Sequence, residues 1–277
     1  MEIVLHLGAH RTGSTAVDQA LSRNRRLLWE NGIGLRLPGD LRAIADFGAV
    51  AELAPRAAEA AEAARRLGGV RAAIDRQVRM ATRRGRVRLI LSEENILGTM
   101  QGNLRARALY PDLAPRLAAY AAVLPAPARI GLAIRSYDTV WMSMVRHVSH
   151  AGHPVRGRGL AAALAAAPRG WPEVIGELRA AFPAAAILVW RQEALAGNVT
   201  AVARRLAGLG DGVAMIPHEA VANASARYAA QDGAAVPRLA FSAAEAERLR
   251  ARYRADLGRI AAMAGGVTLL DPAEVPT

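Results

Sequence analysis

The sequence predicts an α/β protein, with a central and mostly parallel β-sheet flanked by helices in three layers. The first observation is a set of four short apolar runs with the character of buried strands, at residues 3–7, 87–91, 130–134 and 187–190. The second is that long segments of helical composition separate these runs. Continuous apolar strands that alternate with helices are typical of a parallel sheet covered on both faces. With no internal repeat or linker, we expect a single domain over residues 1–277.

The helices are expected between and after these strands. Alanine- and arginine-rich residues 49–82 predict one or two helices, and further helices are expected at 104–123, 171–181 and 198–209. A last helix should begin after Ser242, with that serine as N-cap and Glu245 in the capping-box position, and run to about residue 263. Two segments read as irregular: 150–158, which contains glycines and a proline, and 211–240, which we expect to wrap the surface.

Composition excludes several kinds of chemistry. The chain has no cysteine, which removes disulfides, thiolate nucleophiles and cysteine-ligated metal sites. All 36 basic residues are arginine, so a Schiff base, a pyridoxal phosphate attachment and a phosphate-loop lysine are excluded as well. A hydrophobic fraction of 52% is enough for a sizeable core.

The net charge of +12 favours anionic ligands, yet it does not predict nucleic acid as a partner. Aromatic residues are few and the arginines are dispersed, apart from one dense cluster that we interpret as the solvated edge of a strand. This cluster contains Arg83, Arg84, Arg86 and Arg88. We expect no membrane span, because no run of about 18 apolar residues lacks charge or proline. With a core strand already at residue 3, no leader is expected either, and the predicted location is cytoplasmic.

The most informative segment is residues 3–21, in which a predicted strand leads through a glycine-containing turn into a helix. Gly8, Gly13 and Thr15 almost fit the spacing of a phosphate loop, but the lysine position holds Ser14 and the cation lies earlier, at Arg11. The uncapped N–H groups and the dipole of a helix N-terminus attract anions. The segment therefore predicts an anion-binding cradle.

A second segment follows the third predicted strand. Arg135 ends that strand, and Ser143 lies about two turns along the next helix. Ligands of open parallel sheets bind beyond the carboxyl ends of the strands, so we expect Arg135 to lie at the same rim as the first loop. A guanidinium with a hydroxyl is a good receptor for a second phosphate group.

Together the two segments resemble the sulfotransferases that use 3′-phosphoadenosine 5′-phosphosulfate (PAPS), most of all their bacterial branch. The loop that holds the 5′-phosphosulfate in that family is matched by residues 10–15, His-Arg-Thr-Gly-Ser-Thr, and its 3′-phosphate pair by Arg135 and Ser143. Further likeness lies at 91–98, 190–195 and 249–256. The resemblance implies a P-loop-like three-layer fold and transfer of a sulfuryl group to a hydroxyl of a carbohydrate or small metabolite, without a metal.

The resemblance also implies roles for individual residues. Arg11 would stabilise the leaving group, although the family usually has lysine at this position. The 5′-phosphosulfate would be held by His10, Arg11, Thr12, Gly13, Ser14 and Thr15. Glu93 and Glu94 follow the second predicted strand, and one of them would be the general base for the acceptor. Successive residues of an extended chain point in opposite directions, and we favour Glu94.

For several other residues a structural role is a simpler explanation than a functional one. His147, His150 and His153 have poor metal-binding spacing, although one of them is a candidate for contacting the acceptor. We expect Trp141, Trp190 and a hydrogen-bonded His6 in the core, and Arg227 in solvent. Asp18 should lie at the first turn of the first helix, where its negative charge complements the helix dipole. Two other functions stay open: a non-catalytic nucleotide-binding relative, and an ATP-dependent kinase of the P-loop type, which normally needs a lysine and Mg²⁺.

Overall fold

The computed structural model describes residues 1–53, 60–153, 155, 159–195, 197–210, 212–218 and 239–270. These residues form one sheet, whose strands are β1 (Glu2–His6), β2 (Ile33–Arg36), β3 (Arg88–Ser92), β4 (Arg129–Ile134), β5 (Ala186–Arg191) and β6 (Val267–Leu269). The strand order is β2-β3-β1-β4-β5-β6, and every neighbouring pair is parallel. The prediction of an α/β fold on a parallel sheet is confirmed.

The helices before β4 are α1 (Ser14–Arg23), α2 (Arg25–Glu30), α3 (Pro38–Arg42), α4 (Val50–Leu53), α5 (Ala60–Arg83), α6 (Met100–Ala106) and α7 (Leu113–Val123). Those after it are α8 (Tyr137–His150), α9 (Leu160–Ala165), α10 (Trp171–Ala181), α11 (Gln192–Leu195), α12 (Val199–Ala207) and α14 (Ala243–Ala261). Two 3-10 turns, η1 (Phe47–Ala49) and η3 (Glu94–Ile96), complete the description. Among these helices, none combines the length and apolar character that a membrane crossing requires.

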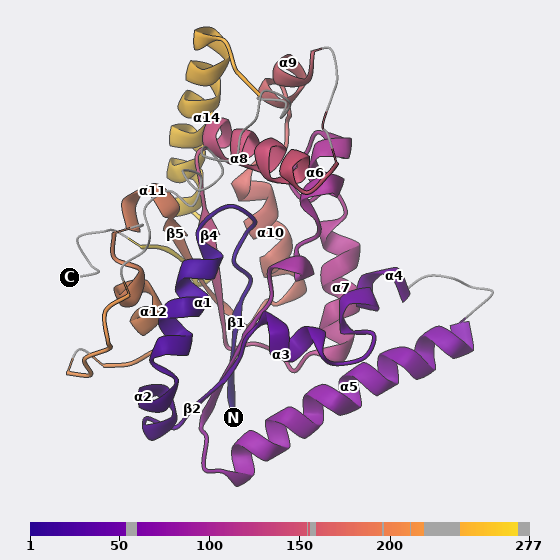
Figure 1. Ribbon diagram of the computed structural model, residues 1–277, viewed down its shortest axis with the longest axis vertical. Helices are drawn as coiled ribbons and strands as arrows, with labels where there is room; N and C mark the ends of the chain where they lie inside the picture. The colour runs from indigo at the N-terminus through magenta and orange to yellow at the C-terminus, as the bar shows by residue number, and fades with distance from the viewer. Residues whose placement is uncertain are drawn as a thin grey trace.

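The two faces of the sheet have separate apolar cores, because successive strand residues point to opposite sides. Leu5 of β1 belongs to the larger core, which includes apolar residues of α5, α7, α8 and α10. Val4, its neighbour, belongs to the smaller core, formed with α1, α2 and α12. Figure 1 shows α1, α2 and α12 on one side of the strands and α7 and α10 on the other. The arrangement is a three-layer α/β architecture.

The order of the strands creates a crevice at the carboxyl end of β1. After β1 the chain goes to β2 at the edge and returns through β3, whereas β4 lies on the other side of β1 and leads to β5 and β6. The connections that follow β1 and β4 therefore leave in opposite directions, and such a switch point is where open α/β sheets bind ligands. The loop after β1 is the indigo arch near the middle of Figure 1, just below α8.

Several sequence predictions for the helices are met closely. Helix α10 covers 171–181 as expected, and α14 begins after Ser242 with the capping box to Glu245 formed. The single helix predicted at 104–123 is wrong, because the chain forms α6 and α7 instead. Arg107 and Tyr110 adopt left-handed conformations (φ 54° and 47°), which end α6 and turn the chain before α7.

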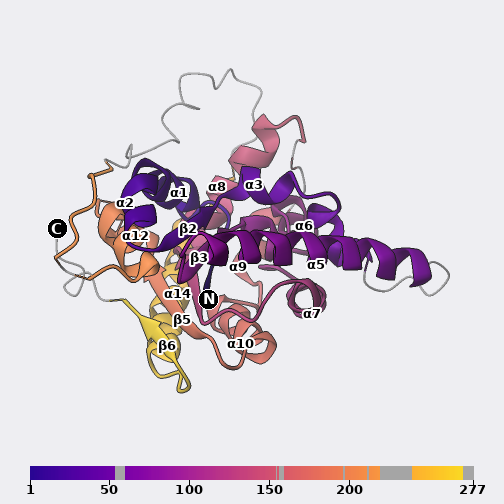
Figure 2. The ribbon, with the colours of Figure 1, turned by 90° about the horizontal axis from the view of Figure 1, so that it is seen from below.

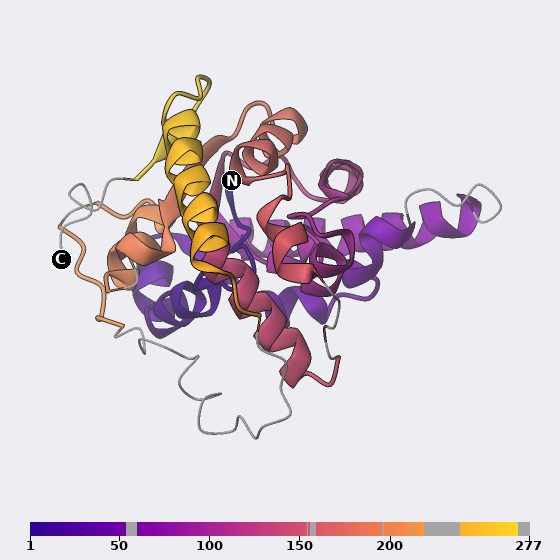
Figure 3. The same cartoon turned by 90° about the horizontal axis from the view of Figure 1, so that it is seen from above.

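Two strands were not predicted from the sequence. β2 has only 4 residues and ends in Arg36, and β6 has only 3 residues, so neither contains an apolar run long enough to indicate a buried strand. The long helix α5 runs across the molecule, and only its N-terminal part projects beyond the other helices (Figure 2). Figure 3 looks onto the end of the sheet where α8 and α14 pack together. Most of the 211–240 segment, including Arg227, lies outside the described residues.

Candidate active site

The loop between β1 and α1 depends on three left-handed residues. Gly8 has a φ of 39°, Arg11 of 64° and Gly13 of 91°. A Cβ at position 8 would lie 2.4 Å from the Cβ of Ser14, so only glycine fits where the chain turns back against the helix. The Thr12 hydroxyl donates to the Ala9 carbonyl at 2.5 Å and closes the turn.

The N-terminus of α1 is left without a side-chain cap. Gly13 occupies the N-cap position and makes no side-chain cap hydrogen bond. The Ala16 N–H donates to the carbonyl oxygen of Gly13 at 3.0 Å, and the N–H groups before it belong to the first turn, where a helix offers no acceptor of its own and an anion can bind. The Ser14 side chain is buried at this point, whereas Thr15 is exposed on the next helical position. The loop and α1 therefore have the geometry of an anion cradle.

The structure joins the two predicted anion-binding segments directly. The Arg11 Nε donates to the Ser143 Oγ at 2.9 Å, so the loop after β1 touches α8. Arg135, which follows β4, donates from Nη1 to the carbonyl oxygen of Arg11 at 2.9 Å. Its Nε donates to the Thr139 hydroxyl at 3.0 Å. Arg11, Arg135 and Ser143 thus form one cluster at the switch point between β1 and β4.

Residues far away in the sequence hold Arg135 in position. The Trp171 indole N–H donates to the carbonyl oxygen of Arg135 at 2.8 Å. The backbone N–H of Ser136 donates to Glu193, which stands just after β5, at 2.5 Å. Burial lowers the pKa of Arg135, and the charge of Arg11 lowers it further, while Glu193 opposes the change. An anion beside these guanidinium groups would relieve their repulsion.

The two adjacent glutamates have different surroundings. Glu93 is buried and accepts both Nε and Nη2 of Arg42, at 2.8 and 2.6 Å, and also the backbone N–H of Asn95. Its carboxylate is therefore committed to a structural ion pair. Glu94 instead lies against the cradle, because its Oε2 accepts from the Ser14 hydroxyl at 3.4 Å. Of these two carboxylates, Glu94 is the one that stands at the anion site.

His10 is a buried part of the loop. Its Nε2 lies 3.2 Å from Oδ1 of Asn95, and its Nδ1 lies 3.2 Å from the Tyr110 hydroxyl, which also accepts the backbone N–H of His10 at 2.9 Å. Because Oδ1 can only accept, the proton belongs on Nε2, and Nδ1 accepts from the tyrosine. Burial lowers the pKa of His10 to about 4, so the ring is neutral near pH 7 and shapes the loop.

A second polar network lies beneath the loop and differs from expectation. Asp18 is buried rather than placed to complement the helix dipole, and its Oδ1 accepts the Ser92 hydroxyl at 2.6 Å. The Nδ1 of His6 lies 2.8 Å from the Ser92 Oγ and 3.2 Å from Asp18. His6 is thus in the core and hydrogen-bonded through Nδ1, as expected, but its buried Nε2 has no partner in the described residues, so the histidine is only half satisfied. These three side chains tie β1, β3 and α1 together below Gly8.

The remaining candidates have simpler positions. His147 lies one turn after Ser143 on α8, and burial lowers its pKa, with a further decrease from the charge of Arg11. Trp141 and Trp190 are buried in the core. In the described part of the chain, no three metal-binding side chains come together.

The sequence matches no family model, no curated protein and no solved structure.

Proposed function

We propose that this protein is a PAPS-dependent sulfotransferase with a P-loop-like fold, which transfers a sulfuryl group to a hydroxyl of a carbohydrate or small metabolite. One observation carries the proposal: the cluster of Arg11, Arg135 and Ser143, formed by two segments 124 or more residues apart. It stands at the switch point of a parallel sheet, where nucleotides bind in such folds. A donor with two separate anionic groups requires two receptors at one rim.

The residues present fit both anionic groups of the nucleotide. The loop, the uncapped α1 and the hydroxyls of Ser14 and Thr15 would hold the 5′-phosphosulfate. Arg135 and Ser143 would hold the 3′-phosphate, because both contact Arg11 and a guanidinium together with a hydroxyl matches the phosphate oxygens. His10 and Thr12 would keep the loop in shape for the ligand.

The proposed chemistry follows from charge. When bound, the nucleotide supplies the sulfuryl group, and negative charge grows on its bridging oxygen as the S–O bond breaks. Arg11 would stabilise that charge more in the transition state than in the ground state, which is the condition for catalysis. Glu94 would take the proton of the acceptor hydroxyl as the new S–O bond forms. Glu93, fully engaged by Arg42, would hold the strand end that presents Glu94.

A kinase fits these residues less well. The position of the phosphate-loop lysine holds Ser14, and the chain contains no lysine that could replace it. The non-catalytic alternative would keep the cradle while Glu94 takes no part in a reaction. Binding and turnover therefore have to be measured separately.

Calorimetric titration with 3′,5′-adenosine bisphosphate tests the proposal, with 5′-AMP and ATP–Mg²⁺ as controls. We expect tight binding of the bisphosphate, much weaker binding of 5′-AMP, and loss of the difference in Arg135→Ala. Preference for ATP–Mg²⁺ would favour the kinase, and binding of none of them would refute a nucleotide site. Sulfuryl transfer to a panel of hydroxyl compounds would then separate the enzyme from a non-catalytic relative.

A further inference from the structure

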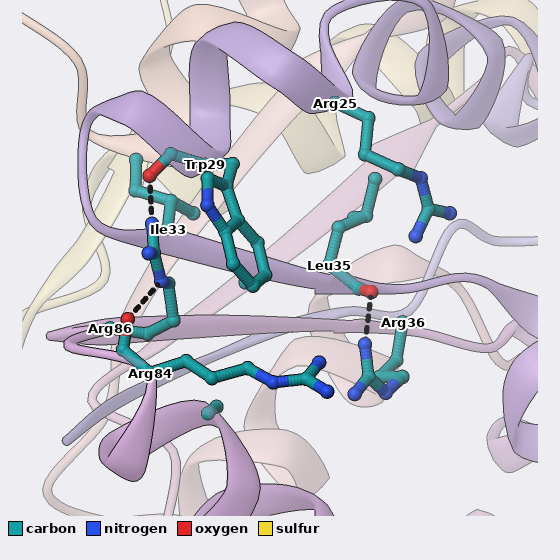
Figure 4. A pocket seen from close by; sticks show the side chains of 9 residues that line it. Arg25, Trp29, Ile33, Leu35, Arg36, Arg84 and Arg86 are labelled. Carbon is teal, nitrogen blue, oxygen red and sulfur yellow. Dashed lines mark hydrogen bonds between the residues drawn. The ribbon is translucent and has the colours of Figure 1, made fainter.

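A group of arginines surrounds a pocket at the edge of the sheet, away from the candidate active site. Its walls include Arg25 and Trp29 of α2, Arg36 of β2, and Arg84 and Arg86 of the turn between α5 and β3. We call it the arginine pocket (Figure 4). Gly34 of β2 and Ala81 of α5 also line it. No residue of the loop between β1 and α1 lines it.

The arginines of this pocket are held mainly by neutral groups. Arg36 donates from Nε to Gln77 at 2.7 Å and from Nη1 to the Leu35 carbonyl at 2.9 Å. Arg86 donates to the backbone carbonyls of Arg84, at 2.9 Å, and Trp29. Its guanidinium lies over the Trp29 ring, 3.7 Å from the ring centre. These contacts fix the orientation of the cations without neutralising their charge.

Carboxylates are scarce around the arginine pocket. Among the described residues, Arg36, Arg84 and Arg86 form no ion pair, and Arg25 only approaches Asp40, at 3.8 Å. Both partners of that contact are nearly half exposed, so it is weak. Burial lowers the pKa of Arg36, and the charges of Arg25 and Arg84 lower it further, against the opposing effect of Asp40. The cations therefore repel one another in the absence of an added negative charge.

We propose that the arginine pocket binds a phosphate or sulfate group as a second anion site. A guanidinium group can form paired hydrogen bonds with two oxygens of a phosphate or sulfate. A tetrahedral oxyanion has oxygens on several sides and can therefore accept from several arginines at once, which a planar carboxylate cannot do. Figure 4 shows the guanidinium groups of Arg25, Arg36 and Arg84 on one side of the view, with Trp29 and Arg86 to their left. The stacking on Trp29 and the bond to Gln77 preorganise two of the receptors, which reduces the ordering cost of binding.

Trp29 provides a local signal for this site. It is 43% exposed, whereas the other tryptophans are buried, so acrylamide quenching of tryptophan fluorescence reports mainly on Trp29. We would titrate the full chain with pyrophosphate and, separately, with heparin, a sulfated polysaccharide. Saturable protection of Trp29 is expected in at least one arm. Tighter pyrophosphate binding would indicate a small phosphate ligand, and tighter heparin binding a sulfated chain.

Matched variants locate the binding. Arg84→Gln removes an exposed side chain and should weaken protection roughly tenfold, as expected for loss of one charge-assisted contact, with a larger effect in Arg36→Gln/Arg84→Gln. Arg79→Gln, on the exposed surface of α5, carries the same charge change and should bind like the parent chain. Arg135→Ala should also bind like the parent, because it alters only the candidate active site. Absence of protection in both arms, or equal weakening by Arg79→Gln, would overturn the proposal.

Discussion

Glu94→Gln should produce opposite changes in nucleotide binding and in turnover. Glu94 Oε2 lies 3.4 Å from the Ser14 Oγ, and a phosphate oxygen bound to that hydroxyl would lie about 2.7 Å from it. The two anions would thus be about 6 Å apart, a repulsion of about 3 kcal/mol at an effective dielectric constant of 20. Arg42, at 3.5 Å from Glu94 Oε1, and the 27% exposure of Glu94 reduce this repulsion. We expect about 1–2 kcal/mol of tighter binding, roughly five- to thirtyfold.

The same substitution should slow sulfuryl transfer, since a glutamine cannot take the acceptor proton. The loss expected for a missing general base is roughly 10²- to 10⁴-fold in kcat. Calorimetry with 3′,5′-adenosine bisphosphate measures the first effect, and steady-state kinetics with the donor measures the second. Glu62→Gln, which removes an exposed carboxylate at the start of α5, is the control and should change neither. Unchanged affinity together with unchanged turnover would refute both the position and the role assigned to Glu94.

Three further predictions address the loop and its surroundings. Arg11→Ala should lower kcat at saturating donor far more than Arg135→Ala, which should mainly raise KM; equal losses of kcat would contradict the division of roles. His10 has its pKa lowered to about 4 in the fold, so the unfolded state gains its proton first as pH falls below 6.5, and stability decreases by about 3 kcal/mol by pH 4. Urea unfolding should accordingly show a flatter pH dependence between 6.5 and 4 in His10→Asn, and an unchanged slope would argue against this cause. Gly8 and Gly152 both have a positive φ, but only position 8 lacks space for a Cβ. Gly8→Ala should therefore lower the free energy of unfolding by well over the roughly 1–2 kcal/mol expected for Gly152→Ala, and thermal denaturation of the two variants measures the difference.

The parts of the fold that the sequence predicts are those with a strong local pattern. β1, β3, β4 and β5 are continuous apolar runs, and a strand with such a run is recognisable without its neighbours. The same is true of α14, whose start has a local capping signal. β2 lacks such a signal because it has only 4 residues, of which Ile33 and Leu35 alone are large and apolar. What makes β2 a strand is pairing with β3, and that information is distant in the sequence.

In the candidate site, too, some contacts follow from a rule that applies to the sequence and others depend on residues far away in the chain. That Arg135 reaches the rim of the first loop follows from the rule for parallel strands, and Arg135 does contact Arg11. The preference for Glu94 over Glu93 could be argued only from alternation along the chain. What separates them in the structure is how each meets Arg42 of α3, 51 residues before Glu93. Glu93 accepts two guanidinium hydrogen bonds, whereas Glu94 only approaches Arg42, at 3.5 Å, and lies against Ser14. The network of His6, Asp18 and Ser92 was likewise hidden, because each residue alone has an ordinary explanation.

The contact between Arg11 and Ser143 suggests how the two anion receptors communicate. In the free protein Arg11 Nε donates to the Ser143 Oγ, the same hydroxyl proposed for the 3′-phosphate. A phosphate bound between Ser143 and Arg135 would accept the Ser143 hydroxyl proton while the same oxygen still accepts from Arg11 Nε, and its negative charge would attract Arg11, whose carbonyl Arg135 already holds. Occupation of the 3′ receptor would therefore place a negative charge next to the cation proposed to stabilise the leaving group and help to fix its position. A donor without a 3′-phosphate would lack that contribution, so we expect the 3′-phosphate to contribute to the rate of transfer as well as to binding.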